Sequence, residues 1–141
     1  MREIKFRGKR IDNGEWIYGS LVQINCHDSR DYVVETQIVL SNGHVFLVDP
    51  ETVGQFIGFK DKDEEDIYEG DILSDYNDDP DSEHFLVEWG YFQDCCVSGM
   101  GFNLYDGSVF TPFFYSDTNT ISAKIIGNKC ENPELLTNQN D

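Results

Sequence analysis

The sequence contains none of the short motifs that mark common catalytic sites. It has no Gly-x-Ser-x-Gly, no phosphate-binding glycine-rich loop and no His-Glu-x-x-His. Its three histidines, His27, His44 and His84, fall in expected loops or turns. Cys26 precedes His27, but adjacent side chains point apart, and Cys–His pairs assemble from distant positions. We therefore predict no catalytic residues and a protein that is not an enzyme.

The spacings of a dedicated metal site are also absent. There is no Cys-x-x-Cys, and the adjacent Cys95 and Cys96 do not have the spacing of a zinc knuckle. Two acidic windows, which start at Asp61 and Asp75, lack the glycine at position 6 and the glutamate at position 12 of a calcium-binding EF-hand loop. We predict no metal site and no cofactor, and only weak surface binding of divalent ions stays open.

Long apolar runs are missing as well. No run approaches the ~20 residues that a membrane-spanning helix needs, and the N-terminus lacks the apolar core of a signal peptide. We expect no membrane association and a cytoplasmic protein. Its four cysteines are then expected to be reduced thiols.

Basic residues are few, and they are unevenly placed. Ten Lys and Arg face 27 Asp and Glu, which gives a net charge of −17 and makes nucleic acid an unlikely partner. Residues 1–10 carry five basic residues and one acidic residue, whereas residues 49–83 carry fourteen acidic residues and two lysines. These segments could attract each other within one molecule or between subunits of a homo-oligomer. Alternatively, the acidic face could imitate phosphate and inhibit a host DNA-binding protein.

The residues that are present indicate a folded, mainly β protein. The chain has 141 residues, of which 39% are hydrophobic and 13% aromatic, which excludes wholesale disorder. Short apolar strand patterns recur every 8–12 residues. Asp12-Asn13-Gly14 and 41–44 (SNGH) predict hairpin turns. Asp49 before Pro50 predicts one helical turn.

Residues 54–73 are the expected centre of the fold. An apolar strand pattern leads into the charged turn 61–66, and a second strand entry follows at Ile67 and Tyr68. Gly70-Asp71 before an apolar pair is how small barrels turn a corner, because glycine accepts a positive φ and close backbone approach. Strands are also expected over 85–89, where Gly90 ends the pattern, and over 123–128, before a helical turn at 132–136.

Aromatic and charged side chains supply the candidate interaction residues. The first hairpin places Trp16 and Tyr18 on one face and Ile17 on the other. The aromatic-rich segment 110–115 fits either a core or an interface with a subunit or partner. The candidates are the basic N-terminus, the aromatics and the acidic loop: Arg2, Lys5, Arg7, Trp16, Tyr18, Tyr68, Asp75, Asp78, Asp79, Asp81, Phe113 and Phe114.

Several segments, in order from residue 2 to residue 136, resemble the YopX family of phage and prophage proteins. They are 4–9 (IKFRGK), 14–21 (GEWIYGSL), 48–56 (VDPETVGQF), Gly58, Asp61, 67–72 (IYEGDI), 87–89 (VEW), 126–128 (IGN) and 131–135 (ENPEL). Where members usually have a short link before Val87, this chain carries the acidic loop 75–83. The loop is therefore not expected to be a family trait.

The resemblance implies a phage or prophage protein in the cytoplasm of a bacterial host, and no catalytic residues to carry over. We expect a mainly β, YopX-like fold with little helix. A strand-rich N-terminal part (1–58) packs beside a small SH3-like, partly open β-barrel (59–130), and 131–141 form a turn and tail. The predicted function is a non-enzymatic protein-interaction or self-assembling module. Its expected partners are copies of itself, or a host or phage protein.

Overall fold

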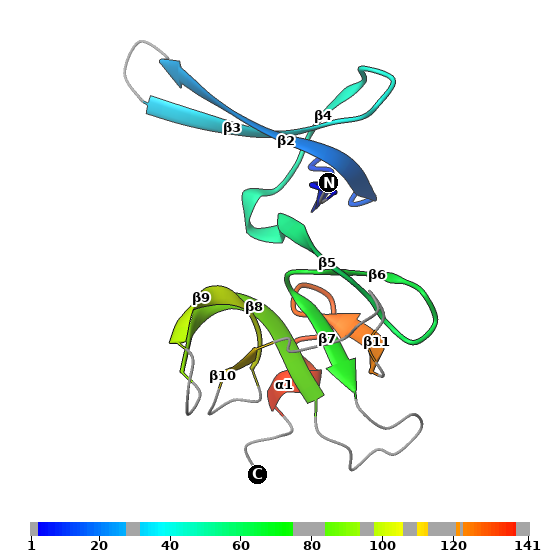
Figure 1. The fold of residues 1–141 in the computed structure, drawn as a ribbon. Helices are drawn as coiled ribbons and strands as arrows, with labels where there is room; N and C mark the ends of the chain where they lie inside the picture. Colours follow the sequence, from blue (N-terminus) through cyan, green and yellow to red (C-terminus); the bar gives the residue numbers. More distant parts are fainter. Residues whose placement is uncertain are drawn as a thin grey trace. The chain divides into compact units, whose positions relative to one another are not determined.

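The computed structural model describes residues 3–27, 32–74, 84–93, 98–105, 110–112, 121 and 123–137. It contains two compact units, Met1–Phe56 and Ile57–Asp141. Both are built from antiparallel strands in open sheets (Figure 1). The predicted mainly β fold with little helix is confirmed, and neither sheet closes into a complete barrel.

In the first unit, the first four strands pair consecutively, and the next strand returns to pair with the first. Its strands are β1 (Phe6–Lys9), β2 (Trp16–His27), β3 (Tyr32–Val39), β4 (Val45–Leu47) and the start of β5 (Gly54–Lys60). The order in the sheet is β4-β3-β2-β1-β5. Both predicted hairpin turns are confirmed: Asn13 Oδ1 accepts from the Glu15 N–H at 3.0 Å, and Asn42 Oδ1 accepts from the His44 N–H at 3.0 Å.

The predicted helical turn is also confirmed, as a 3-10 helix. This helix, η1 (Pro50–Thr52), begins after Asp49, whose Oδ1 accepts from the Glu51 N–H at 3.0 Å. Proline fits the first position because it has no N–H to leave unsatisfied there. Thr52 Oγ1 in turn accepts from the Lys9 N–H at 2.9 Å, so η1 is tied to β1.

The ends of β1 and β4 meet, which curls the sheet around a small core. Arg10 forms an antiparallel bridge with Val48, and the Ile11 N–H donates to Leu47 O at 3.1 Å. On the enclosed face, Ile38 and Val48 are 0% and 1% exposed. We call this the core face. It also carries Ile17, Leu21 and Phe46, by strand alternation and register.

Gly19 marks the closest backbone approach in the first unit. A Cβ built on Gly19 would lie 2.3 Å from the carbonyl oxygen of Val39. No side chain fits that distance, so glycine is needed where the β3 backbone begins to pair with β2, at Ser20 opposite Val39.

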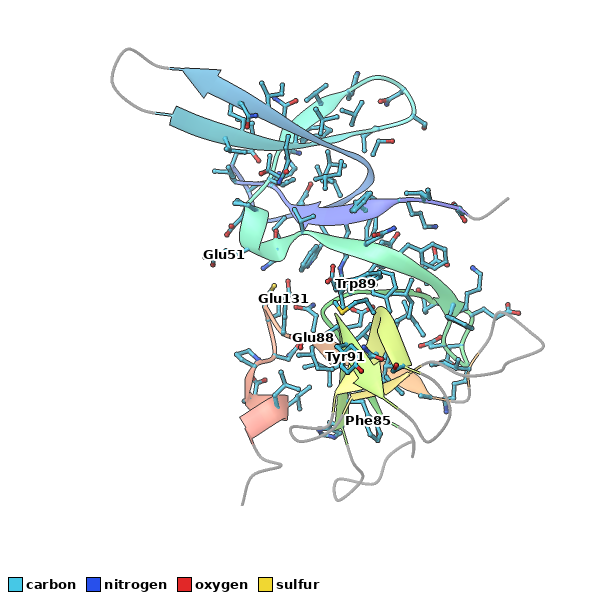
Figure 2. All side chains as sticks on the ribbon, turned by 60° about the vertical axis from the view of Figure 1, so that its left-hand side comes forward. Glu51, Phe85, Glu88, Trp89, Tyr91 and Glu131 are labelled. Atoms are coloured by element: carbon cyan, nitrogen blue, oxygen red, sulfur yellow. The ribbon has the colours of Figure 1, made fainter. Side chains whose placement is uncertain are left out.

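In the second unit the five-stranded sheet has the order β10-β9-β8-β7-β11. Its strands are β7 (Asp71–Ser74), β8 (His84–Gln93), β9 (Ser98–Tyr105), β10 (Phe110–Pro112) and β11 (Lys124–Asn128). The rest of β5 pairs with β6 (Asp66–Tyr68), and a short helix, α1 (Glu134–Thr137), follows β11. Figure 2 labels Trp89 and Tyr91 along β8, and both are more than half exposed.

The core of this unit is one cluster. Ile57, Ile67, Leu73, Val87 and Ala123 are all at most 6% exposed and pack together. Partly buried hydrophobic side chains surround them: Phe59, Phe102, Leu104, Ile121 and Ile125. The segment predicted to be central, 54–73, supplies three of the five buried members.

The corner at Gly70-Asp71 behaves as the sequence predicts. Gly70 has a φ of 94°, its N–H donates to Val87 O at 2.8 Å, and its carbonyl accepts from the Lys129 N–H at 2.9 Å. A residue with a Cβ would be strained at this φ.

By contrast, the predicted end of a strand at Gly90 is wrong, since β8 continues to Gln93. Gly90 lies opposite Gly101, so the ladder continues through a pair of glycines.

Candidate interaction surface

The strand register gathers basic and aromatic side chains on one face of the first unit. Arg7 lies opposite Tyr18, and Lys9 lies opposite Trp16. Residues directly opposite each other in an antiparallel pair point to the same face. This face, opposite the core face, is called the open face below.

Cations stack on aromatic rings along β1. Arg7 Cζ lies 4.8 Å from the centroid of the Trp16 ring, and Lys9 Nζ lies 5.6 Å from the same ring. Lys5 Nζ lies 4.7 Å from the Phe56 ring. These separations are within the range of cation–π attraction. Arg7 is only 8% exposed, so its contact with Trp16 is largely desolvated.

The open face also exposes a group of apolar side chains, around the polar pair Glu35 and Gln37 on β3. Tyr18, Val45 and Leu47 are 51%, 51% and 47% exposed, and Val22 and Ile24 are 37% and 39% exposed. Register places Val22 and Ile24 in line with Tyr18 along β2, and Val45 and Leu47 on β4. A sheet face with this many apolar side chains in water is typical of a contact surface.

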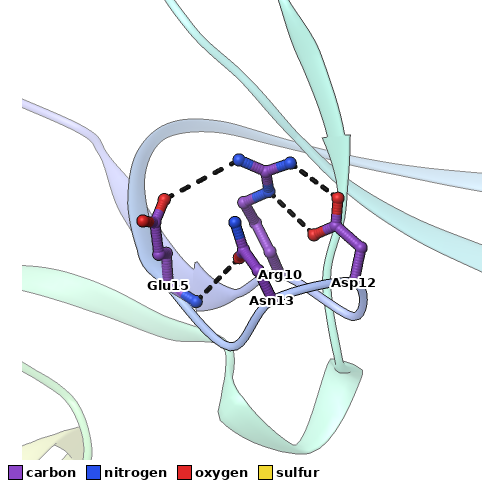
Figure 3. A network of polar contacts seen from close by, with 4 residues as sticks. All are labelled: Arg10, Asp12, Asn13 and Glu15. Carbon is purple, nitrogen blue, oxygen red and sulfur yellow. Dashed lines mark hydrogen bonds and ion pairs between the residues drawn. The ribbon is translucent and has the colours of Figure 1, made fainter.

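A polar network fixes the first hairpin turn at the rim of this unit (Figure 3). Arg10 donates from Nε to Asp12 Oδ1 at 2.9 Å and from Nη2 to Asp12 Oδ2 at 2.6 Å. Its Nη1 lies 3.7 Å from Glu15 Oε2. The hydrogen bonds from Arg10 hold the pKa of the Asp12 carboxyl below its usual range.

A shallow pocket of about 380 Å³ adjoins this network, lined by Lys9, Arg10, Ile11, Gly14, Asp49 and Pro50. The two groups best suited to fix a ligand are already engaged. Arg10 is held by Asp12 and stacks 4.4 Å from the Phe46 ring, and Asp49 caps η1. The pocket therefore lies between the first hairpin turn and the cap of η1, and these two lining groups serve the fold.

In the second unit, two acidic residues are structural parts of the fold. Asp61 is 1% exposed; its Oδ1 accepts from the N–H groups of Asp63 and Glu65, both at 2.9 Å. Its Oδ2 accepts from the Ile125 N–H at 3.1 Å. Asp71 is 2% exposed, and its Oδ2 accepts from the Tyr68 N–H at 2.8 Å. These carboxylates satisfy backbone donors inside the molecule and present no charge at the surface.

A smaller apolar patch lies on the β8–β9 hairpin. Trp89, Tyr91 and Met100 are 53%, 55% and 58% exposed and lie on one face by register. Trp89 packs edge-to-face on Phe102, with ring centroids 5.0 Å apart. The buried Asn103 donates from Nδ2 to Gly90 O at 2.9 Å and to Gly101 O at 3.0 Å, which braces this part of the hairpin.

Comparison with known proteins identifies the family. The family model described as YopX protein matches residues 5–137. The chain belongs to the YopX family. The predicted resemblance is thereby confirmed over nearly the whole chain.

One solved structure similar to this YopX-family chain is the crystal structure of protein EF1440 from Enterococcus faecalis. The two sequences are 21% identical, and the alignment covers 96% of this chain and 99% of EF1440 with a TM-score of 0.53. That similarity supports the fold alone. No curated protein matches the chain.

Four of the predicted interaction residues of this YopX-family chain share one face: Lys5, Arg7, Trp16 and Tyr18. Tyr68 is elsewhere, in the second unit, and is only 3% exposed, so its ring offers no contact surface. The other predicted residues lie outside the described residues: Arg2, Asp75, Asp78, Asp79, Asp81, Phe113 and Phe114.

The exposed aliphatic residues of the open face are not among the predicted interaction residues. The alternation in β2 shows only that Trp16, Tyr18, Val22 and Ile24 lie on one side of the strand, and it does not show whether that side is buried or exposed. In a half-buried strand such a row is read as core. The register shows instead that the row faces away from Ile38.

Neither histidine with a described side chain belongs to a reactive cluster. His44 packs edge-on against Phe46 at a centroid distance of 6.5 Å, and His84 Nδ1 lies 3.1 Å from Leu135 O. Within the described ranges, no group of three or more His, Cys, Asp or Glu is arranged to hold a metal ion. In the same ranges, no helix is long and apolar enough to cross a membrane.

Proposed function

We propose that this YopX-family chain is a phage- or prophage-encoded protein-interaction module that works in the cytoplasm of its bacterial host without catalysis. The observation that carries the proposal is the open face. Five apolar side chains there are between 37% and 51% exposed: Tyr18, Val22, Ile24, Val45 and Leu47. Apolar surface of this kind is stabilised by contact with another protein.

The partner that we propose is a second copy of the chain. The first unit holds six basic and eight acidic residues, a net charge of −2, whereas the second holds four basic and nineteen acidic residues, a net charge of −15. Two copies therefore repel each other strongly through their second units and only weakly through their first units. The nearly neutral unit that carries the open face is where copies of this acidic protein can meet.

Apolar contact, more than attraction between opposite charges, should hold the assembly together. The basic side chains that the structure describes in the first unit already contact aromatic rings: Lys5, Arg7, Lys9 and Arg10. Salt screens exposed charges within ~10 Å at 0.1 M, but it does not weaken hydrophobic contact. We expect the assembly to persist, or to strengthen, at high ionic strength.

Light scattering coupled to size-exclusion chromatography tests this proposal directly. The full chain is measured over a concentration series at low salt and at ~1 M salt. A dimer or larger species in both conditions is the expected result. An assembly lost at high salt would assign the contact to charge pairing, and a monomer in both would overturn the proposal.

The acidic loop offers a matched control. Replacing Asp75, Asp78, Asp79 and Asp81 with asparagine removes four negative charges from the second unit. Self-assembly should be unchanged or slightly stronger, because like-charge repulsion falls. If assembly is lost instead, the acidic loop carries the contact.

The second candidate, a phosphate-mimicking inhibitor of a host DNA-binding protein, depends on the acids of 61–83, of which the described residues expose the short run 63–65. Its four loop aspartates lie outside the described residues, and Asp61 and Asp71 are buried. Nucleic acid remains an unlikely partner for a chain of net charge −17. The same asparagine variant also tests this candidate, because a DNA-binding host protein captured only by the unchanged chain would favour mimicry.

A further inference from the structure

The β2–β3 ribbon extends past the strands that flank it. β1 pairs with β2 only over residues 16–19, and β4 pairs with β3 only over residues 37–39. β2 and β3 nevertheless remain paired from Ser20 opposite Val39 to His27 opposite Tyr32. Figure 1 shows the two strands continuing together as an arm. Among the described residues, no other strand pairs with the outer edge of β2 over residues 21–25.

Both faces of this arm expose β-branched side chains. Val22 and Ile24 are 37% and 39% exposed on the open face, and Val34 is 47% exposed on the opposite face. An isolated two-stranded ribbon is at best marginally stable in water, and a third strand or a covering layer normally stabilises it. Leu21 and Val22 still lie in a three-stranded part of the sheet, because their β3 partners pair with β4. Over residues 23–25 the described part of the chain pairs no third strand with the ribbon.

The open edge of β2 also lacks the devices that normally prevent pairing between molecules. Natural edge strands carry lysine, proline or a bulge that blocks edge-to-edge contact. β2 is twelve residues long and contains no charged residue and no proline, and its pairing with β3 has no register shift. β3, in contrast, carries Glu35. In a chain with a net charge of −17, an uncharged edge is the one that a second copy can approach without opposing like charges.

We propose that the open edge of β2, residues 21–25, pairs antiparallel with the same edge of a second copy about a two-fold axis. The inference rests on the proposed self-assembly and narrows its contact to the part of the open face at Val22 and Ile24, with the β4 side chains outside it. A two-fold interface needs a surface that complements itself, and an open antiparallel edge does so through its backbone N–H and C=O groups. In a register centred on Gln23, Val22 lies opposite the partner's Ile24, and the open faces of both copies join into one continuous surface.

Lysine substitutions distinguish pairing through the edge from docking through the open face. The test variant is Val22→Lys with Ile24→Lys, which places like charges opposite each other in the proposed register. The matched control is Val45→Lys with Leu47→Lys, on the same face but on β4. Each variant changes the net charge from −17 to −15, so neither gains long-range repulsion. Circular dichroism and thermal unfolding confirm that both variants fold.

We expect the β2 variant to raise the dimer dissociation constant at least ~10-fold, while the β4 control stays within ~3-fold of the unchanged chain. If both variants lose the dimer equally, the open face docks as a face. The proposed function then stands and the edge contact is overturned. If neither variant has an effect, the contact lies elsewhere and the inference fails. A monomeric unchanged chain overturns both proposals.

Disulfide trapping provides a readout that does not depend on charge. With the four native cysteines replaced by serine, Gln23→Cys should form an interchain disulfide on mild oxidation. Residues opposite each other in an antiparallel pair have Cα atoms ~4.5–5.5 Å apart, within the range that a disulfide spans. The matched control is Gln37→Cys, on β3 between β2 and β4. Trapping at both positions or at neither would contradict the proposed pairing.

Discussion

The two units differ in where their most buried charged side chains make contacts. In the second unit, Asp61 and Asp71 are buried and accept hydrogen bonds from backbone N–H groups. In the first unit, Lys5 and Arg7 lie over aromatic rings on a face that also exposes apolar residues. The buried aspartates therefore stabilise the backbone of the second unit, whereas the β1 cations pack against aromatic side chains beside an exposed apolar surface.

The hydrophobic cores of the two units also differ. Hydrophobic side chains of the second unit converge on one cluster around Leu73 and Val87, both 0% exposed. The first unit encloses Ile38 and Val48 on one face and leaves the other face open. The second unit therefore buries its apolar side chains within itself, and the first unit leaves apolar surface that a partner can cover.

The largest expected effect comes from the core of the second unit. Leu73→Ala should destabilise the protein by about 3 kcal/mol, because it removes a fully buried side chain from the middle of the cluster. Urea unfolding followed by circular dichroism measures this loss. Val45→Ala, at a site that is 51% exposed, is the control and should stay within ~0.5 kcal/mol. Equal losses of unfolding free energy at both sites would contradict the contrast between a buried core in the second unit and an exposed face in the first.

A somewhat smaller effect is expected at Asp61. Asp61→Ala should cost about 2–3 kcal/mol, since it leaves backbone donors at Asp63, Glu65 and Ile125 without their acceptor. Asp63→Ala is the matched control on the same turn. Its side chain is 55% exposed and lies 4.0 Å from Lys124, so the change should cost less than ~1 kcal/mol. Similar values for the two variants would show that Asp61 is not the residue that organises this turn.

Local signals in the sequence predicted the local elements correctly. Asp12-Asn13-Gly14 forms a turn because the Asn13 side chain bonds the backbone two residues on. Asp49 begins η1 because its carboxylate accepts from the Glu51 N–H. Each of these interactions spans a few residues, so composition and spacing determine it without help from the rest of the fold.

The roles of Asp61 and Gly90 depend on partners far along the chain. Asp61 lies in a strongly acidic stretch and looks like one more surface charge, but the Ile125 N–H that it binds is 64 positions away. Gly90 has the appearance of a strand end, yet Gly101 lies opposite it and the ladder continues. Only the tertiary pairing decides such cases.

The candidate interaction surface could be predicted only in part. Alternation along β2 predicted that Trp16 and Tyr18 share a face, and the register with β1 confirms it. That the same face stays exposed at Val22 and Ile24 could not be predicted, because exposed and buried rows of apolar residues have the same period. The row is exposed because the sheet curls around Ile38 on its other side.

A smaller effect is expected where cations meet rings in the first unit. A double-mutant cycle with Arg7→Ala and Trp16→Ala should give a coupling free energy of about 1 kcal/mol, since this contact is largely desolvated. The same cycle with Lys9→Ala should give less, because Lys9 Nζ lies farther from the ring, at 5.6 Å. Urea unfolding of each variant provides the values. A stronger coupling for Lys9 than for Arg7 would contradict the assignment of Arg7 as the main partner of Trp16.

The smallest expected effect is at the exposed turn and concerns titration more than stability. Arg10→Gln should raise the pKa of Asp12 toward its usual value, because it removes the charged hydrogen-bond donor that lowers it. Glu15→Gln is the matched control: it removes only the 3.7 Å contact with Arg10, so the pKa of Asp12 should stay low. Carboxyl chemical shifts recorded against pH measure both.

Since the folded pKa of Asp12 is lowered, its stabilising contribution is present above the unfolded pKa and is lost as pH falls through the folded pKa. Asp12 is exposed, so the unfolding free energy should barely change while the titration curve moves. If Arg10→Gln leaves the pKa of Asp12 low, the backbone N–H groups of the turn are its main cause, and Arg10 only lies beside it.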